Sequence, residues 1–105
     1  MPDQPIPAST ADVMIAEYIS YMTGLGVNMN NQTQSTSFGG TDLTTWLGTV
    51  MPFADELRIF NGRYPAGHAN AGRTTIILWP YYHGAPAEDN KGAAIQPLNE
   101  GAGRP

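Results

Sequence analysis

The chain has 105 residues and a formal net charge of −4. It has no cysteine, and this excludes disulfides, thiolate zinc sites, iron–sulfur ligation and cysteine nucleophiles. Charged residues make up only 13% of it, against about 25% in an average soluble domain, and a surface with so little charge favours association. The acidic balance argues against phosphate-backbone binding, so we expect no nucleic-acid partner.

The N-terminal segment shows no targeting signal. MPDQPIPAST has neither a basic region nor an apolar region of the secretory type, and no later run approaches the roughly 18 to 20 apolar residues that span a bilayer. We therefore expect a cytoplasmic protein without membrane contact, folded as one small domain over residues 1–105.

An extended arm over residues 1–8 is predicted to lead into a helix from Ala11 to Thr23. Ser9 or Thr10 can cap this helix, because a side-chain oxygen there satisfies an amide of the first turn. Its apolar residues lie at helical spacing. They are Met14, Tyr18, Tyr21 and Met22, with Ile15 and Ile19 on one side.

Gly24 and Gly26 are expected to end the first helix. Residues 27–37 are almost entirely Asn, Gln, Ser and Thr, a composition that predicts a mobile polar loop. A second helix follows, capped by Thr41 and ended by Pro52. Its predicted core face is spaced i, i+3, i+4, i+7 and consists of Leu43, Trp46, Leu47 and Val50.

Two strands are predicted, Glu56–Phe60 and Thr74–Trp79. The second is so continuously apolar that we expect it in the centre of the sheet. Asn61-Gly62 has the composition of a tight turn, and Pro80 is expected to end regular pairing because proline has no amide donor. The sequence therefore predicts a long hairpin loop between the strands.

These elements predict an α+β fold in which two helices pack on a small, mainly antiparallel sheet. Glycine and proline recur over residues 83–105, so this segment is expected to form an irregular C-terminal arm. Ile95 and Leu98 are its only apolar anchors of any size.

The strand pair reading LRIFNGRYP and TTIILWP, with the preceding Ser37-Phe38 and the helix TDLTTWL, resembles a family of small uncharacterised bacterial proteins. The resemblance covers most of the chain and implies the same layout of helices and strands, but no activity. Similar proteins often end in a segment with cysteine and proline. This chain ends in EGAGRP without cysteine, so no role of that segment carries over.

Residues 54–82 and their surroundings hold the candidate binding residues. Three of the five basic residues are arginines here, and a guanidinium recognises carboxylate or phosphate in a planar, bidentate way. The structural alternative is that Arg58 pairs with Asp55 or Glu56 and stacks on Phe60 or Tyr64. The candidates for ligand or partner binding are Arg58, Phe60, Arg63, Tyr64, His68, Arg73, Tyr81, Tyr82 and His83.

No catalytic, metal or cofactor site is predicted. The glycine-rich connection lacks the Lys-Ser or Lys-Thr of a P-loop, and no Gly-x-Ser-x-Gly elbow occurs. His68 and His83 have no acid at diagnostic spacing and no third ligand. We therefore expect a non-enzymatic binding or assembly module that contacts a protein partner, or itself as a homo-oligomer, through the aromatic and arginine surface of the hairpin. The alternative is a protein or small enzyme that binds a small anionic metabolite with the arginines and a histidine.

Overall fold

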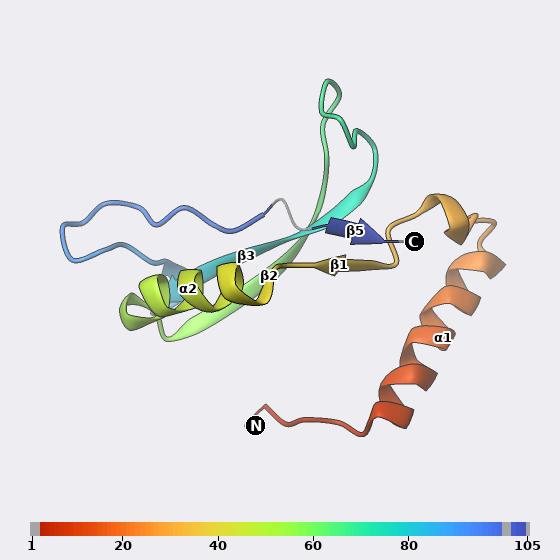
Figure 1. The fold of residues 1–105 in the computed structure, drawn as a ribbon, viewed down its shortest axis with the longest axis horizontal. Helices are drawn as coiled ribbons and strands as arrows, with labels where there is room; N and C mark the ends of the chain where they lie inside the picture. Colours follow the sequence, from red (N-terminus) through yellow and green to blue (C-terminus); the bar gives the residue numbers. More distant parts are fainter. Residues whose placement is uncertain (1–2, 100–101, 105) are drawn as a thin grey trace. The chain divides into compact units, whose positions relative to one another are not determined.

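The computed structural model describes residues 3–99 and 102–104. In chain order, with η for a 3-10 helix, the elements are α1 (Ala8–Gly24), η1 (Met29–Asn31), β1 (Ser35–Ser37), α2 (Gly40–Val50), η2 (Met51–Phe53), β2 (Glu56–Arg63), β3 (Thr74–Tyr82), β4 (Ala85–Pro86) and β5 (Ala102–Arg104). One antiparallel sheet has the order β2-β3-β4, and β1 pairs antiparallel with β5 (Figure 1). The predicted α+β class, with two helices and a small antiparallel sheet, is therefore confirmed over the described residues. The chain divides into two compact units, Met1–Gln32 and Thr33–Pro105.

In the first unit, α1 begins earlier than its sequence predicts. Ser9 and Thr10, the predicted caps, lie inside the helix, so that prediction is wrong. Pro7 is the N-cap, with φ −57° and ψ 144°, and its carbonyl accepts a hydrogen bond from Ala11 N at 3.1 Å. The proline ring fixes φ near the value that the chain needs on entering a helix. The helix can therefore start directly after Pro7 without a side-chain cap.

The polar segment after α1 contains regular structure that its composition does not predict. Gly26 ends the helical region with φ 90°, as expected for a glycine stop. The Asn28 side chain then accepts a hydrogen bond from Asn30 N at 3.1 Å and starts η1. In the second unit, Ser35–Ser37 forms β1 and pairs with β5. Because β5 lies at the other end of the chain, local composition carries no sign of this pairing.

The second unit contains α2 and the main sheet. The predicted face of α2 is confirmed, since its four apolar residues are the least exposed of the helix and Val50 is buried. Thr41 does not cap α2 and lies in its first turn, because Gly39 takes the N-cap position and accepts from Leu43 N at 2.9 Å. The helix passes directly into η2, which contains Pro52.

The β2–β3 hairpin is longer than predicted at both ends. Asn61 and Gly62 do not turn the chain but continue β2 opposite Ile76 and Thr75. Pro80 does not end β3 but lies opposite Leu57. Its side chain is fully buried and its carbonyl accepts from Ala87 N at 2.9 Å. Apolar packing around the ring thus outweighs the loss of one amide donor. β3 is the central strand, as expected.

A tight turn joins β3 to the C-terminal segment. His83 and Gly84 have φ of 52° and 81°, and they are the two residues between the paired Tyr82 and Ala85, a pattern typical of a two-residue type I′ hairpin. The arm then returns along β3, where Leu98 and Leu78 exchange two hydrogen bonds of 2.9 Å. The predicted arm thus adds to the free edge of the central strand. Part of it, residues 100–101 and 105, lies outside the described residues.

Candidate binding surface

One face of the hairpin carries a cluster of aromatic and arginine side chains. Side chains alternate between the two faces of a strand, and directly opposed residues of an antiparallel pair share a face. Arg58 lies opposite Trp79, and Phe60 and Tyr81 lie two residues further along β2 and β3. We refer to Arg58, Phe60, Trp79 and Tyr81 as the aromatic face. Period-two spacing in each strand is therefore what brings these four residues together.

The three rings of the aromatic face contact one another. Phe60 lies 6.0 Å from Trp79 and 6.0 Å from Tyr81 between ring centroids, and Trp79 lies 6.2 Å from Tyr81. Both pairs that include Trp79 are edge-to-face, with interplanar angles of 73°, an arrangement that aromatic pairs favour. Phe60 is nevertheless 37% exposed. The cluster therefore presents packed rings to its surroundings.

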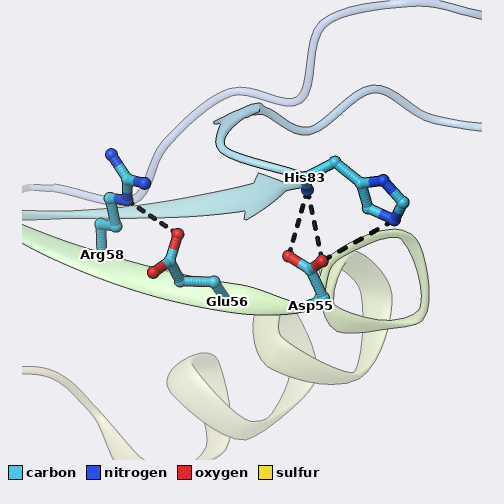
Figure 2. Close-up of polar contacts among 4 residues, drawn as sticks. All are labelled: Asp55, Glu56, Arg58 and His83. Atoms are coloured by element: carbon cyan, nitrogen blue, oxygen red, sulfur yellow. Dashed lines mark hydrogen bonds and ion pairs between the residues drawn. The ribbon is translucent and has the colours of Figure 1, made fainter.

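The Arg58 side chain contacts the Tyr81 ring of this cluster and forms a hydrogen bond with Glu56. Its guanidinium carbon lies 4.1 Å from the centroid of the Tyr81 ring, within the range of a cation–π contact. Its Nε donates to Glu56 Oε1 at 2.8 Å (Figure 2). Both charged side chains keep more than a third of their surface exposed, so their ion pair adds little stability. The predicted structural pairing with Glu56 is present, and the stacking partner is Tyr81.

Two nitrogen atoms of the hairpin are buried and have no hydrogen-bond partner among the described residues: Trp79 Nε1 on the aromatic face and Arg73 Nη2 at the loop end. A buried donor without an acceptor costs about 1–3 kcal/mol. Arg73 Nε does donate, to Thr33 Oγ1 at 3.4 Å. The hairpin thus contains two buried donors that no described acceptor satisfies.

A second group of predicted residues lies at the hairpin loop. The rings of Tyr64 and His68 stack at 4.2 Å, and His68 Nδ1 accepts from Asn70 N at 3.0 Å. Arg63 Nε donates to Gly72 O at 3.1 Å. A shallow cavity of about 450 Å³ is lined by Arg63, Tyr64, Pro65, Ala66, Ala71 and Gly72. Arg63 Nε and His68 Nδ1 therefore already have hydrogen-bond partners within the loop.

The three arginines do not converge on one site. Tyr64 N donates a backbone hydrogen bond to Arg73 O at 3.0 Å, and Arg73 lies an even number of residues before Trp79, so Arg73 follows the face of Arg58. Arg63 lies opposite Thr74 and follows the other face. Trp79, opposite Arg58, comes six residues after Arg73, which at about 3.3 Å per residue separates these two arginines by roughly 20 Å. A small anion shared by all three is not compatible with this register.

The two histidines are also far apart, because His68 precedes β3 and His83 follows it. His83 belongs to the type I′ turn, and its amide donates to Asp55 Oδ1 and Oδ2 at 3.3 and 3.2 Å (Figure 2). Its ring stacks on Tyr82 at 3.9 Å. No group of three side chains suited to a metal ion occurs among the described residues. His83 and Asp55 therefore form a structural corner of the sheet.

The candidates predicted from the sequence did not include Trp79, and Asp55 was named as a possible partner of Arg58 with no role in the turn. For Trp79 the signal was present, since it alternates with Tyr81 along β3 in the same way as Arg58 alternates with Phe60. For Asp55 no local signal exists, because its partner His83 lies 28 residues away.

The chain matches no family model, no curated protein and no solved structure. The resemblance to small bacterial proteins therefore stays a prediction. Within the described part of the chain, no helix has the length and apolar character needed to cross a membrane.

Proposed function

We propose that this chain is a non-enzymatic binding or assembly module that contacts a protein partner, or a second copy of itself, through the aromatic face. The observation that carries the proposal is the cluster of three contacting rings with Arg58 across Tyr81, one of which, Phe60, remains 37% exposed. Tryptophan, tyrosine and arginine are the residue types that contribute most to binding energy at protein interfaces.

The position of β2 supports this proposal. Among the described residues β2 pairs with β3 only, so it is an edge strand of eight residues without proline. Ile59 and Phe60 are exposed on its two faces, by 61% and 37%. An open, partly apolar edge is a surface to which another protein can bind. Glu56, Arg58 and Arg63 add charge to this edge and restrict which partners fit.

The absence of a converged set of chemical groups in the described residues agrees with a binding role. The arginines are separated by the register, the histidines lie at opposite ends of β3, and His83 serves the turn. General acid–base chemistry requires such groups within hydrogen-bonding reach of one substrate atom. A protein-sized partner, in contrast, can contact residues that lie far apart on one face.

The test is native mass spectrometry of the full chain purified gently from its own host, with Phe60→Ala and Ile59→Ala as a matched pair. The two residues are neighbours in β2, and the control residue Ile59 is the more exposed of the two but lies on the other face. We expect a stoichiometric protein partner or copy on the wild type, its loss from Phe60→Ala and its retention by Ile59→Ala. A reproducible small-molecule mass in place of a protein, or equal behaviour of the two variants, would refute the proposal.

A further inference from the structure

Large apolar side chains of the first unit are left uncovered along α1. Six of them keep more than half of their surface exposed: Val13 58%, Met14 57%, Ile15 55%, Tyr18 53%, Tyr21 66% and Leu25 63%. No residue of the 17-residue helix is buried. In proteins most of a helix's stability comes from packing of an apolar face. Nothing among the described residues of the first unit therefore covers these side chains of α1.

Apolar residues on one side of α1 form a regular line, whereas the exposed Val13 lies on another side. Ala11, Met14, Tyr18, Tyr21 and Leu25 follow one another at intervals of three, four, three and four residues, and we refer to them as the α1 seam. This alternation places a stripe along one side of a helix and is the spacing by which two helices pack side by side. Ile15 and Met22 widen the stripe on one edge. The seam is continuous over the length of the helix and into Leu25, its C-cap.

Charge decides which kind of surface fits this seam. Asp12 and Glu17 are the only charged residues in α1, and both lie outside the seam. A helix that lies on an anionic lipid surface carries lysine and arginine on its polar side, whereas α1 has none. A second copy of the same helix meets no charge at the seam, so no like charges oppose one another there.

The exposed area of the seam is large enough for two copies of α1 to pack against each other. A buried aromatic side chain covers about 150–250 Å², so the four large seam residues together with Ile15 at its edge, exposed by 53–66%, offer roughly 100 Å² each. With the smaller contributions of their neighbours, this gives about 600 Å² per copy and about 1,200 Å² for two copies, at the lower end of specific, stable interfaces.

We propose that the α1 seam packs against the α1 seam of a second copy of this chain and forms a homodimer. This self-association uses a surface of the first unit and does not depend on the aromatic face. A two-fold pair is the commonest arrangement of identical chains, and it lets one self-complementary stripe cover both copies.

The first test is sedimentation velocity of the full chain at increasing micromolar concentrations. The wild type should approach a dimer. Tyr18→Glu combined with Tyr21→Glu places charge in the seam and should weaken dimerisation by at least about 30-fold, the factor that corresponds to loss of one strong interface anchor. The control is Val13→Glu combined with Ser20→Glu, which adds the same two charges outside the seam, at residues that are both exposed, and should leave the dimer intact.

A second measurement guards against loss of the helix itself in the glutamate variant. The chain has no cysteine, so one introduced cysteine reports its neighbours without competition. Tyr18 is the middle residue of the seam and faces its counterpart in either relative direction of the helices. Tyr18→Cys should therefore form an intermolecular disulfide, which requires Cα atoms about 4.4–6.8 Å apart, whereas Val13→Cys should not.

Three results would overturn the inference. The wild type could stay monomeric at all concentrations, which would mean that α1 is covered by its own chain. Val13→Cys could cross-link as readily as Tyr18→Cys, which would mean that the seam has no special position. A dimer lost in Phe60→Ala but kept in the seam variant would assign self-association to the aromatic face instead. The last result separates this inference from the proposed function.

Discussion

The contact between Arg58 and Tyr81 predicts a measurable coupling in stability. Arg58→Met removes the guanidinium and keeps an unbranched stem, and Tyr81→Leu removes the ring and keeps apolar volume. At a partly exposed site a cation–π contact contributes about 0.5–1 kcal/mol, and the 4.1 Å separation lies well within its range. We therefore expect the double variant to be less destabilised than the sum of the single variants by about that amount.

Urea unfolding at equilibrium measures this coupling, with Tyr82→Leu in place of Tyr81→Leu as the control cycle. Tyr82 is the next residue of β3 and lies on the opposite face, so its coupling to Arg58 should be near zero. A third cycle with Glu56→Gln should give a smaller coupling that decreases with added salt, because both partners are exposed to solvent. If the Arg58–Tyr81 coupling does not exceed the Arg58–Tyr82 value, Arg58 is not fixed by the aromatic face.

The remaining predictions concern the turn after β3 and the helix before β2. Gly84→Ala forces a side chain into φ 81° and should lower stability by about 1 kcal/mol, whereas Gly48→Ala, where nothing lies within 4 Å of the new Cβ, should raise it by about 1 kcal/mol. Thermal unfolding should show midpoints that move in opposite directions by roughly 4–8 °C each, and shifts of the same sign would contradict the type I′ turn. Asp55→Ala removes the acceptor of His83 N and should cost about 1 kcal/mol, with Asp55→Asn closer to wild type because it keeps one acceptor oxygen. Hydrogen exchange of the His83 amide measures this effect directly, and unchanged exchange in Asp55→Ala would refute it.

The helices and the central strand could be predicted from the sequence because their signals are local. The i, i+3, i+4, i+7 spacing of α2 and the apolar run of β3 each depend on neighbours within one element. The predicted helix caps were wrong. Pro7 and Gly39 take the N-cap positions and begin their helices through backbone geometry, without a side-chain acceptor. The rule for hydroxyl caps therefore pointed at residues that lie inside the helices.

The sequence predicted which residue types form the binding surface better than it predicted how these residues are arranged. Arg58, Phe60 and Tyr81 were among the predicted binding residues and lie together. Arg63 does not join them, because continuation of β2 past Asn61 places it on the other face. Whether Asn61-Gly62 turns or stays extended is decided by pairing with β3, and that pairing is not encoded in the dipeptide. A single turn assignment thus determined whether the arginines would form a cluster.

Exposed apolar surface occurs in both units, and this has a consequence for folding. The first unit has no buried residue in α1, whereas the second has Val50, Leu78, Ala87 and Pro80 buried. If α1 pairs with a second copy, its stability follows mass action and rises with protein concentration. The hairpin of the second unit has its own core, so pairing through α1 alone does not make its stability depend on concentration. Hydrogen exchange at two protein concentrations separates the cases, since protection of the α1 amides should increase with concentration while that of β3 stays constant. Equal protection of α1 at both concentrations would mean that its cover comes from within the same chain.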